Sequence, residues 1–158
     1  MTQEKKQEMT LKISQANKTQ MITILYEMVL EYLDEAMDDL SIGKKEDAQK
    51  ALSNAQSCID ELIRSLNLKY SLAKDLHKLY IYFKKELIVA GATYSIHKIW
   101  RVAQNIKSLC EAYRELEKED TSAPMMGNIQ TVYAGLTYGR NSLNEAVTAG
   151  SYNRGFMA

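Results

Sequence analysis

The chain has 158 residues, with 20 Lys and Arg against 20 Asp and Glu, and therefore a formal net charge of zero. This length suits one domain that folds without a metal or a disulfide. The balanced charge argues against a nucleic-acid-binding protein, which needs a basic excess to displace counterions. No apolar run approaches the roughly 18 residues of a transmembrane helix, and the polar start MTQEKKQEM lacks a secretory signal. We therefore expect a cytoplasmic protein without membrane insertion.

Charge and glycine content change near Pro124, the only proline. Five of the seven glycines follow it, and residues 121–158 carry three charged side chains. This shift predicts a boundary between a charged helical domain over 17–120 and a tail over 121–158. Residues 1–16, which precede the first predicted helix, are expected to form a flexible N-terminal segment.

Apolar residues recur at helical spacing in four stretches of the body. These stretches predict helices over 18–40, 45–66, 71–90 and 95–118. Asn17 is a good N-cap for the first, and Gln20 completes a capping box. Gly43 is expected to end this helix, and the third is expected to begin with Ser71 as N-cap and to end at Gly91. Short connections then predict an all-α, antiparallel up-down four-helix bundle with an extended, partly helical C-terminal tail.

Two of these helices hold more apolar residues than one buried stripe requires. Runs such as Ile24-Leu25-Tyr26 in the first helix and 79–83 in the third extend beyond one face. Two interpretations remain open: a wide core face with a few exposed residues, or a groove for a partner helix.

The sequence holds no pattern that predicts catalysis. His77 and His97 are the only histidines, and neither belongs to a Glu-x-x-His or His-x-Cys motif. Cys58 and Cys110 lie inside apolar helical patterns, as expected for buried thiols in a reducing compartment. The acidic residues of 27–39 are expected to form a solvated helix face. We expect no enzymatic activity, no cofactor and no metal site.

Residues 16–33 resemble the opening of the flagellar secretion chaperone family, FliS. That family shows a small-residue turn, then a helix with a Leu-Tyr step and a trailing aromatic-Leu pair, as at Leu25, Tyr26, Tyr32 and Leu33. The three later stretches are similar to the family's later helices. The matching positions there are Ala55, Ile59, Leu62, Leu66, Leu79, Tyr80, Tyr82, Leu87, Ala90, Leu109, Glu111, Ala112 and Tyr113.

This resemblance covers about residues 13–117 and implies a non-enzymatic export chaperone. Its client would be flagellin, whose disordered C-terminal segment would fold along the bundle and be kept from premature polymerisation before delivery to the flagellar export apparatus. An export-gate component would be a further partner. The alternative is a generic helical adaptor without chaperone activity.

The expected partner-binding positions are apolar residues of the first three helices. They are Leu25, Tyr26, Val29, Leu62, Leu66, Tyr80, Tyr82 and Phe83. A small shift in helix phase exchanges core and groove positions, so the pattern does not decide which of them face outward.

The tail over 121–158 has apolar and aromatic residues where a solubilising extension would have charges. Ser142 and Glu145 form a capping box that predicts a short helix near 142–149, ended by Gly150. Three interpretations remain open: a flexible extension, a segment that docks on the bundle where the client binds, and a segment that recruits a second flagellar protein.

Overall fold

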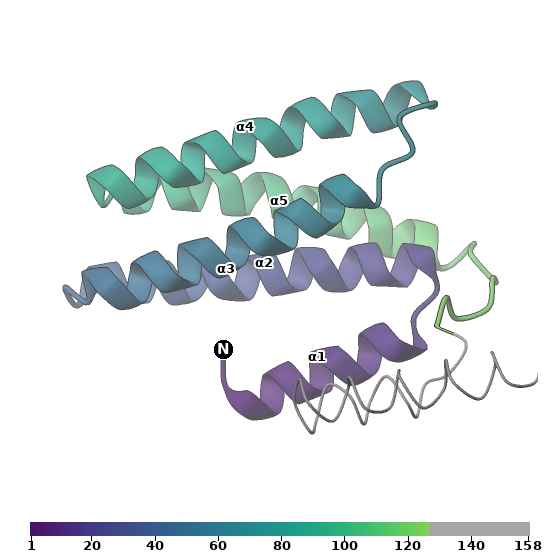
Figure 1. Cartoon of the computed structure of the whole chain (residues 1–158), viewed down its shortest axis with the longest axis horizontal. Coiled ribbons are helices and arrows are strands. Elements are labelled where there is room, and N and C mark those ends of the chain that lie inside the picture. The colour runs from purple at the N-terminus through teal and green to yellow at the C-terminus, as the bar shows by residue number, and fades with distance from the viewer. Residues whose placement is uncertain (127–158) are drawn as a thin grey trace, which may run out of the picture.

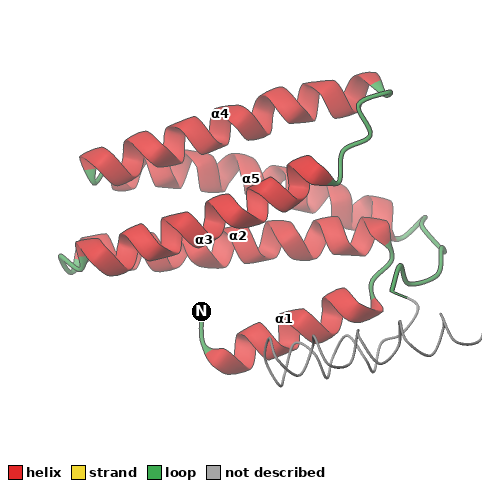
Figure 2. Cartoon of the chain, in the orientation of Figure 1, coloured by secondary structure: helices red, strands yellow, loops and turns green. Residues whose placement is uncertain are grey.

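The computed structural model describes residues 1–126, and this part of the chain contains helices and no strand (Figure 2). The helices are α1 (Gln3–Gln15), α2 (Lys18–Ser41), α3 (Lys45–Arg64), α4 (Ser71–Thr93) and α5 (Ile96–Glu117). The all-α prediction is confirmed for these residues. The helix expected near 142–149 lies outside the described residues.

Helices α2 to α5, here called the helical core, pack around one cluster of buried side chains. Consecutive helices run in opposite directions (Figure 1). Helix α2 packs along α1, α3 and α5, whereas α4 packs along α3 and α5 and reaches α2 through the side chains of Tyr80 and Tyr26. Helix α1 lies below α2, and α4 lies at the opposite, upper side of the molecule (Figure 1). Helix α2 is therefore the most enclosed element, and α4 is the peripheral member of the core.

Local sequence sets three of the helix ends, and two of these ends, at Asn17 and Gly43, are as predicted. The Asn17 side chain accepts the Gln20 N–H at 2.9 Å, and the Gln20 side chain accepts the Asn17 N–H at 3.0 Å, which completes the capping box of α2. Gly43 follows α2 with a φ of +79°, a conformation that glycine adopts without strain. Ser95 caps α5 by accepting the Lys98 N–H at 3.3 Å.

Both predicted ends of α4 are wrong. Ser71 is the first helical residue, and Tyr70 holds the N-cap position without a side-chain hydrogen bond. The helix continues past Gly91 and ends at Tyr94, which has a left-handed φ of 53°. Gly91 is buried, and a Cβ there would lie 2.8 Å from Gln49 Oε1. This glycine therefore lies inside α4 facing the end of the Gln49 side chain of α3, and it is not a helix stop.

The segment expected to be flexible, 1–16, contains helix α1 in the structure. Met9 is 3% exposed and packs against Ile24 of α2. The N-terminal amine of Met1 pairs with the Glu35 carboxylate. The hydropathy pattern does not reveal this helix, because few of its residues are apolar and they form only a narrow contact with α2.

The residues after α5 are tied to the turn between α1 and α2. The Thr19 hydroxyl donates to the Asp120 carboxylate, and the Met125 N–H donates to the Ala16 carbonyl at 3.0 Å. Hydrogen bonds from Ser122 and Thr19 lower the pKa of Asp120 to about 2. The described chain thus ends beside the first turn of α2.

No helix within residues 1–126 has the length and hydropathy to cross a bilayer. In the same residues, no group of three or more His, Cys, Asp or Glu side chains is arranged to hold a metal ion. Cys58 and Cys110 are free and buried, and burial raises the pKa of the Cys58 thiol to about 11.

The two glycines predict opposite responses to alanine. We expect Gly43→Ala to lower the free energy of unfolding by about 1 kcal/mol, because alanine is strained at positive φ. Gly91→Ala should raise it by up to about 1 kcal/mol, because alanine favours the helix and the exposed Gln49 side chain can move aside. Urea denaturation measures both. A larger loss for Gly91→Ala than for Gly43→Ala would contradict this assignment.

Candidate partner-binding groove

An apolar groove lies at the end of the helical core where α2 and α4 begin and α3 and α5 end. Its cavity has a volume of about 450 Å³. Most of its lining is apolar or aromatic: Ile22, Leu66, Tyr70, Leu72, Ala73, Leu76, Tyr80 and Tyr113. The polar residues of the lining are Lys18, Thr19, Ser65 and Asn67. We call this set of residues the end groove; among them Lys18 carries the one charged side chain.

Two large apolar side chains of the end groove stand exposed to solvent. Tyr70 is 67% exposed and Leu72 is 68% exposed. The loop between α3 and α4 positions Tyr70: the Asn67 side chain accepts the Lys69 N–H at 3.2 Å, and the Asn67 carbonyl accepts the Tyr70 N–H at 3.1 Å. Exposed apolar side chains that adjoin an apolar cavity are typical of a protein-binding surface.

Three tyrosines form the deepest part of the end groove and the core beneath it. Tyr80 is 1% exposed, and its hydroxyl forms a hydrogen bond with the hydroxyl of the buried Tyr26. The Tyr113 ring packs edge-on against Tyr26, with 5.4 Å between ring centroids. Burial raises the pKa of all three phenols, that of Tyr80 to about 12. The floor is therefore uncharged at neutral pH and suits an apolar ligand.

The structure places most of the eight expected partner-binding residues in the core. Six of them are at most 6% exposed: Leu25, Tyr26, Val29, Leu62, Tyr80 and Phe83. Leu66 is partly buried and Tyr82 is 44% exposed. The end groove brings Leu66 and Tyr80 together, and Tyr82 lies on α4 outside it. Only Leu66 and Tyr82 offer a partner a substantial surface without rearrangement of the core.

The apolar excess of the two helices has two different explanations. On α2 it is covered, because α1 lies over residues such as Ile24 that face away from the other helices. On α4 it remains on the surface, where Tyr82, Ile88 and Val89 are between 42% and 57% exposed. The wide-core interpretation thus holds for α2, whereas α4 presents apolar side chains to solvent.

Sequence reasoning missed Tyr70 and Leu72 as surface residues. Tyr70 lies in the break between two predicted helices, where helical periodicity carries no information. Leu72 precedes the buried Leu76 by four residues, which is helical spacing, but Leu72 lies in the first turn of α4, at the end of the core. The available signal was the presence of Leu68, Tyr70 and Leu72 around the break between the two helices, where polar turn residues are usual.

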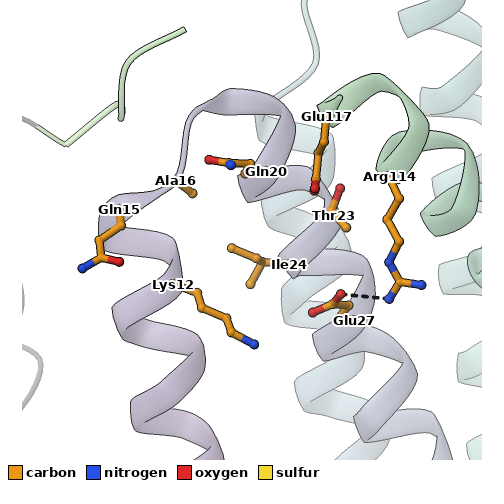
Figure 3. A pocket seen from close by; sticks show the side chains of 9 residues that line it. All are labelled: Lys12, Gln15, Ala16, Gln20, Thr23, Ile24, Glu27, Arg114 and Glu117. Carbon is orange, nitrogen blue, oxygen red and sulfur yellow. Dashed lines mark hydrogen bonds and ion pairs between the residues drawn. The ribbon is translucent and has the colours of Figure 1, made fainter. Parts of the chain in front are cut away.

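A second recess, of about 430 Å³, lies between α1, α2 and α5 (Figure 3). Arg114 donates to Glu27 Oε1 at 2.9 Å, and this hydrogen bond raises the pKa of Arg114. Lys12 of α1 reaches toward the same space from the facing wall (Figure 3). Charged side chains from α1, α2 and α5 line this recess, whereas the end groove is mostly apolar. The recess therefore suits polar contacts between α1 and the core better than the binding of an apolar ligand.

Comparison with known proteins identifies the class to which this helical protein belongs. A family model described as flagellar protein FliS matches residues 1–120. This match spans well over half of the chain, and the chain belongs to the FliS family. The family comprises chaperones of flagellar export that bind flagellar proteins, and it is not a family of enzymes. No match was found among curated proteins.

The tyrosine pair beneath the end groove predicts a non-additive response. Tyr26→Phe and Tyr80→Phe should each lower the free energy of unfolding by about 1–3 kcal/mol, because each leaves a buried hydroxyl without its partner. The double variant should lose less than the sum of the two, because no orphaned hydroxyl remains.

Urea denaturation of the two single variants and the double variant measures this coupling. Tyr82→Phe is the matched control, because Tyr82 is exposed and its variant should unfold like the parent. Strictly additive losses would show that the two hydroxyls do not stabilise each other.

Proposed function

We propose that this chain is a cytoplasmic chaperone that binds the disordered C-terminal segment of flagellin in the end groove. Binding keeps flagellin from polymerising prematurely and allows its delivery to the flagellar export apparatus, with an export-gate component as a further partner. The observation that carries this proposal is the apolar end groove, with Tyr70 and Leu72 exposed beside an uncharged floor. Membership of the FliS family supports a flagellar protein as the client.

The surface next to the end groove suits a client that folds into a helix. Leu79 and Tyr82 follow Leu72 at separations of seven and ten residues, which places all three on one side of α4. An amphipathic helix docks into such a surface through apolar anchors spaced along one of its own faces. In this proposal the client inserts anchors into the end groove and continues along α4 to Tyr82.

The energetics favour a complex that forms and dissociates readily. Full burial of one Leu or Phe side chain contributes about 1.5–3 kcal/mol, whereas folding of a disordered segment on binding costs about 2–5 kcal/mol or more. A client therefore needs several anchors, and the loss of one contact has a large effect on affinity. Such a balance suits a chaperone, which has to release its client for export.

The test is titration calorimetry of the full-length chain against the C-terminal segment of flagellin from the same organism. Binding with a strongly negative heat-capacity change is expected, because apolar surface is buried. Leu72→Asp should lower the affinity at least tenfold, because a carboxylate replaces an apolar anchor in the interface. The fold should tolerate this change, since Leu72 is 68% exposed.

Ile42→Asp is the matched control for this substitution. Ile42 is 66% exposed, like Leu72, but it follows the opposite end of α2, about 30 Å along the helix axis from Ile22. Its variant should bind as the parent does. Equal losses in both variants would contradict the end groove as the binding site, and no binding by the parent chain would favour the generic adaptor.

A further inference from the structure

We propose that residues 127–158 of this chain occupy the end groove when no client is bound, so that the chain carries its own competing ligand. This inference deepens the proposed function and rests on it for the identity of the client, since tail and client share one groove. It starts from two observations: the end groove is apolar and open, and the described chain ends close to it.

The point at which the tail leaves the described structure is fixed beside the end groove. Thr19 belongs to the lining of the groove, and its hydroxyl donates to Asp120, which follows α5. Five residues after Asp120, the Met125 N–H donates to the carbonyl of Ala16, immediately before α2. The 32 residues of 127–158 therefore start within a few residues of the groove lining and need no long connection to reach it.

The composition of the tail matches the chemistry of the groove. Residues 127–158 contain three charged side chains, and their apolar residues include Val132, Tyr133, Leu136 and Tyr138 within seven positions. A segment of this length spans about 48 Å as a helix and about 110 Å fully extended, more than the length of any helix in the core. The tail has both the reach and the apolar side chains to fill the end groove.

Tethering makes even a weak ligand an effective competitor. A segment joined by a short connection acts at an effective concentration of about 1 mM. With a dissociation constant of about 0.1 mM, such a tail leaves the groove free about one-tenth of the time and lowers the apparent affinity for the client about tenfold. Loss of tail docking should therefore raise client affinity about tenfold.

The experiment compares three full-length chains by NMR of their leucine and isoleucine methyl groups, without client. They are the parent, the variant Tyr133→Asp/Leu136→Asp, and the control Thr131→Asp/Thr137→Asp, which adds the same charge at polar positions. The methyl signals of Leu72 and Leu76 should shift in the first variant and match the parent in the control. The signals of Ile42, at the other end of α2, should stay unchanged in all three.

Each outcome bears on one proposal separately. Unchanged Leu72 and Leu76 signals in Tyr133→Asp/Leu136→Asp would overturn tail docking. Signal shifts that weaken when the protein is diluted would also overturn it, because they would show that the tail of a second copy occupies the groove. Calorimetry with the flagellin segment then tests the client: a tenfold gain in affinity for this variant supports competition. Methyl shifts without any client binding would retain tail docking and reject the proposed function.

Discussion

The rest of the structure depends on the simultaneous burial of α2 by three neighbours. Helices α1, α3 and α5 all contact α2, and its side chains Tyr26, Val29 and Leu33 have no exposed surface. A helix that is apolar on most of its circumference is stable only when it is enclosed in this way. Because these three elements cover α2, no large apolar side chain of this helix is exposed. Among the helices of the core, α4 has the most exposed large apolar residues. A surface for a protein partner is therefore expected on α4 and at the ends of the core.

The end groove follows from how the core ends. Helix α3 stops at Arg64, and the chain crosses to α4 through a loop that presents Tyr70 beside the first turn of α4. The Tyr26–Tyr80 hydroxyl pair joins α2 to α4 diagonally across the core and keeps the base of this region closed. Ion pairs such as Lys84–Asp60 and Lys98–Glu86 join α4 to α3 and α5 at partly exposed positions, where each contributes little stability. A closed floor and a more peripheral outer helix would suit the client exchange that we propose for this surface.

The sequence predicted helices better than it predicted surfaces, and the difference has a physical origin. Helix ends at Asn17, Gly43 and Ser95 depend on local hydrogen bonds and φ values, which neighbouring residues determine. Gly91 was assigned wrongly because the helix continues past it to Thr93 on the support of neighbouring helices, and local sequence does not encode that support. Six of eight expected binding residues lie in the core because periodicity locates an apolar face but not the neighbouring helix that covers it, and here α2 to α5 cover one another's apolar faces. The cover that α1 provides is limited to Ile24 and its neighbours on α2, and few apolar residues in α1 indicate it.

In the complex that we propose, the client binds at the end groove while the core beneath it stays closed. The most direct measurement is methyl chemical-shift mapping of the full-length chain during titration with the flagellin C-terminal segment. The largest changes are expected at Ile22, Leu66, Leu72 and Leu76, with the signals of Val29 and Leu87 in the centre of the core nearly unchanged. Changes centred on Val29 and Leu87 would mean that the core opens to admit the client, and would contradict binding at the end groove over a closed core.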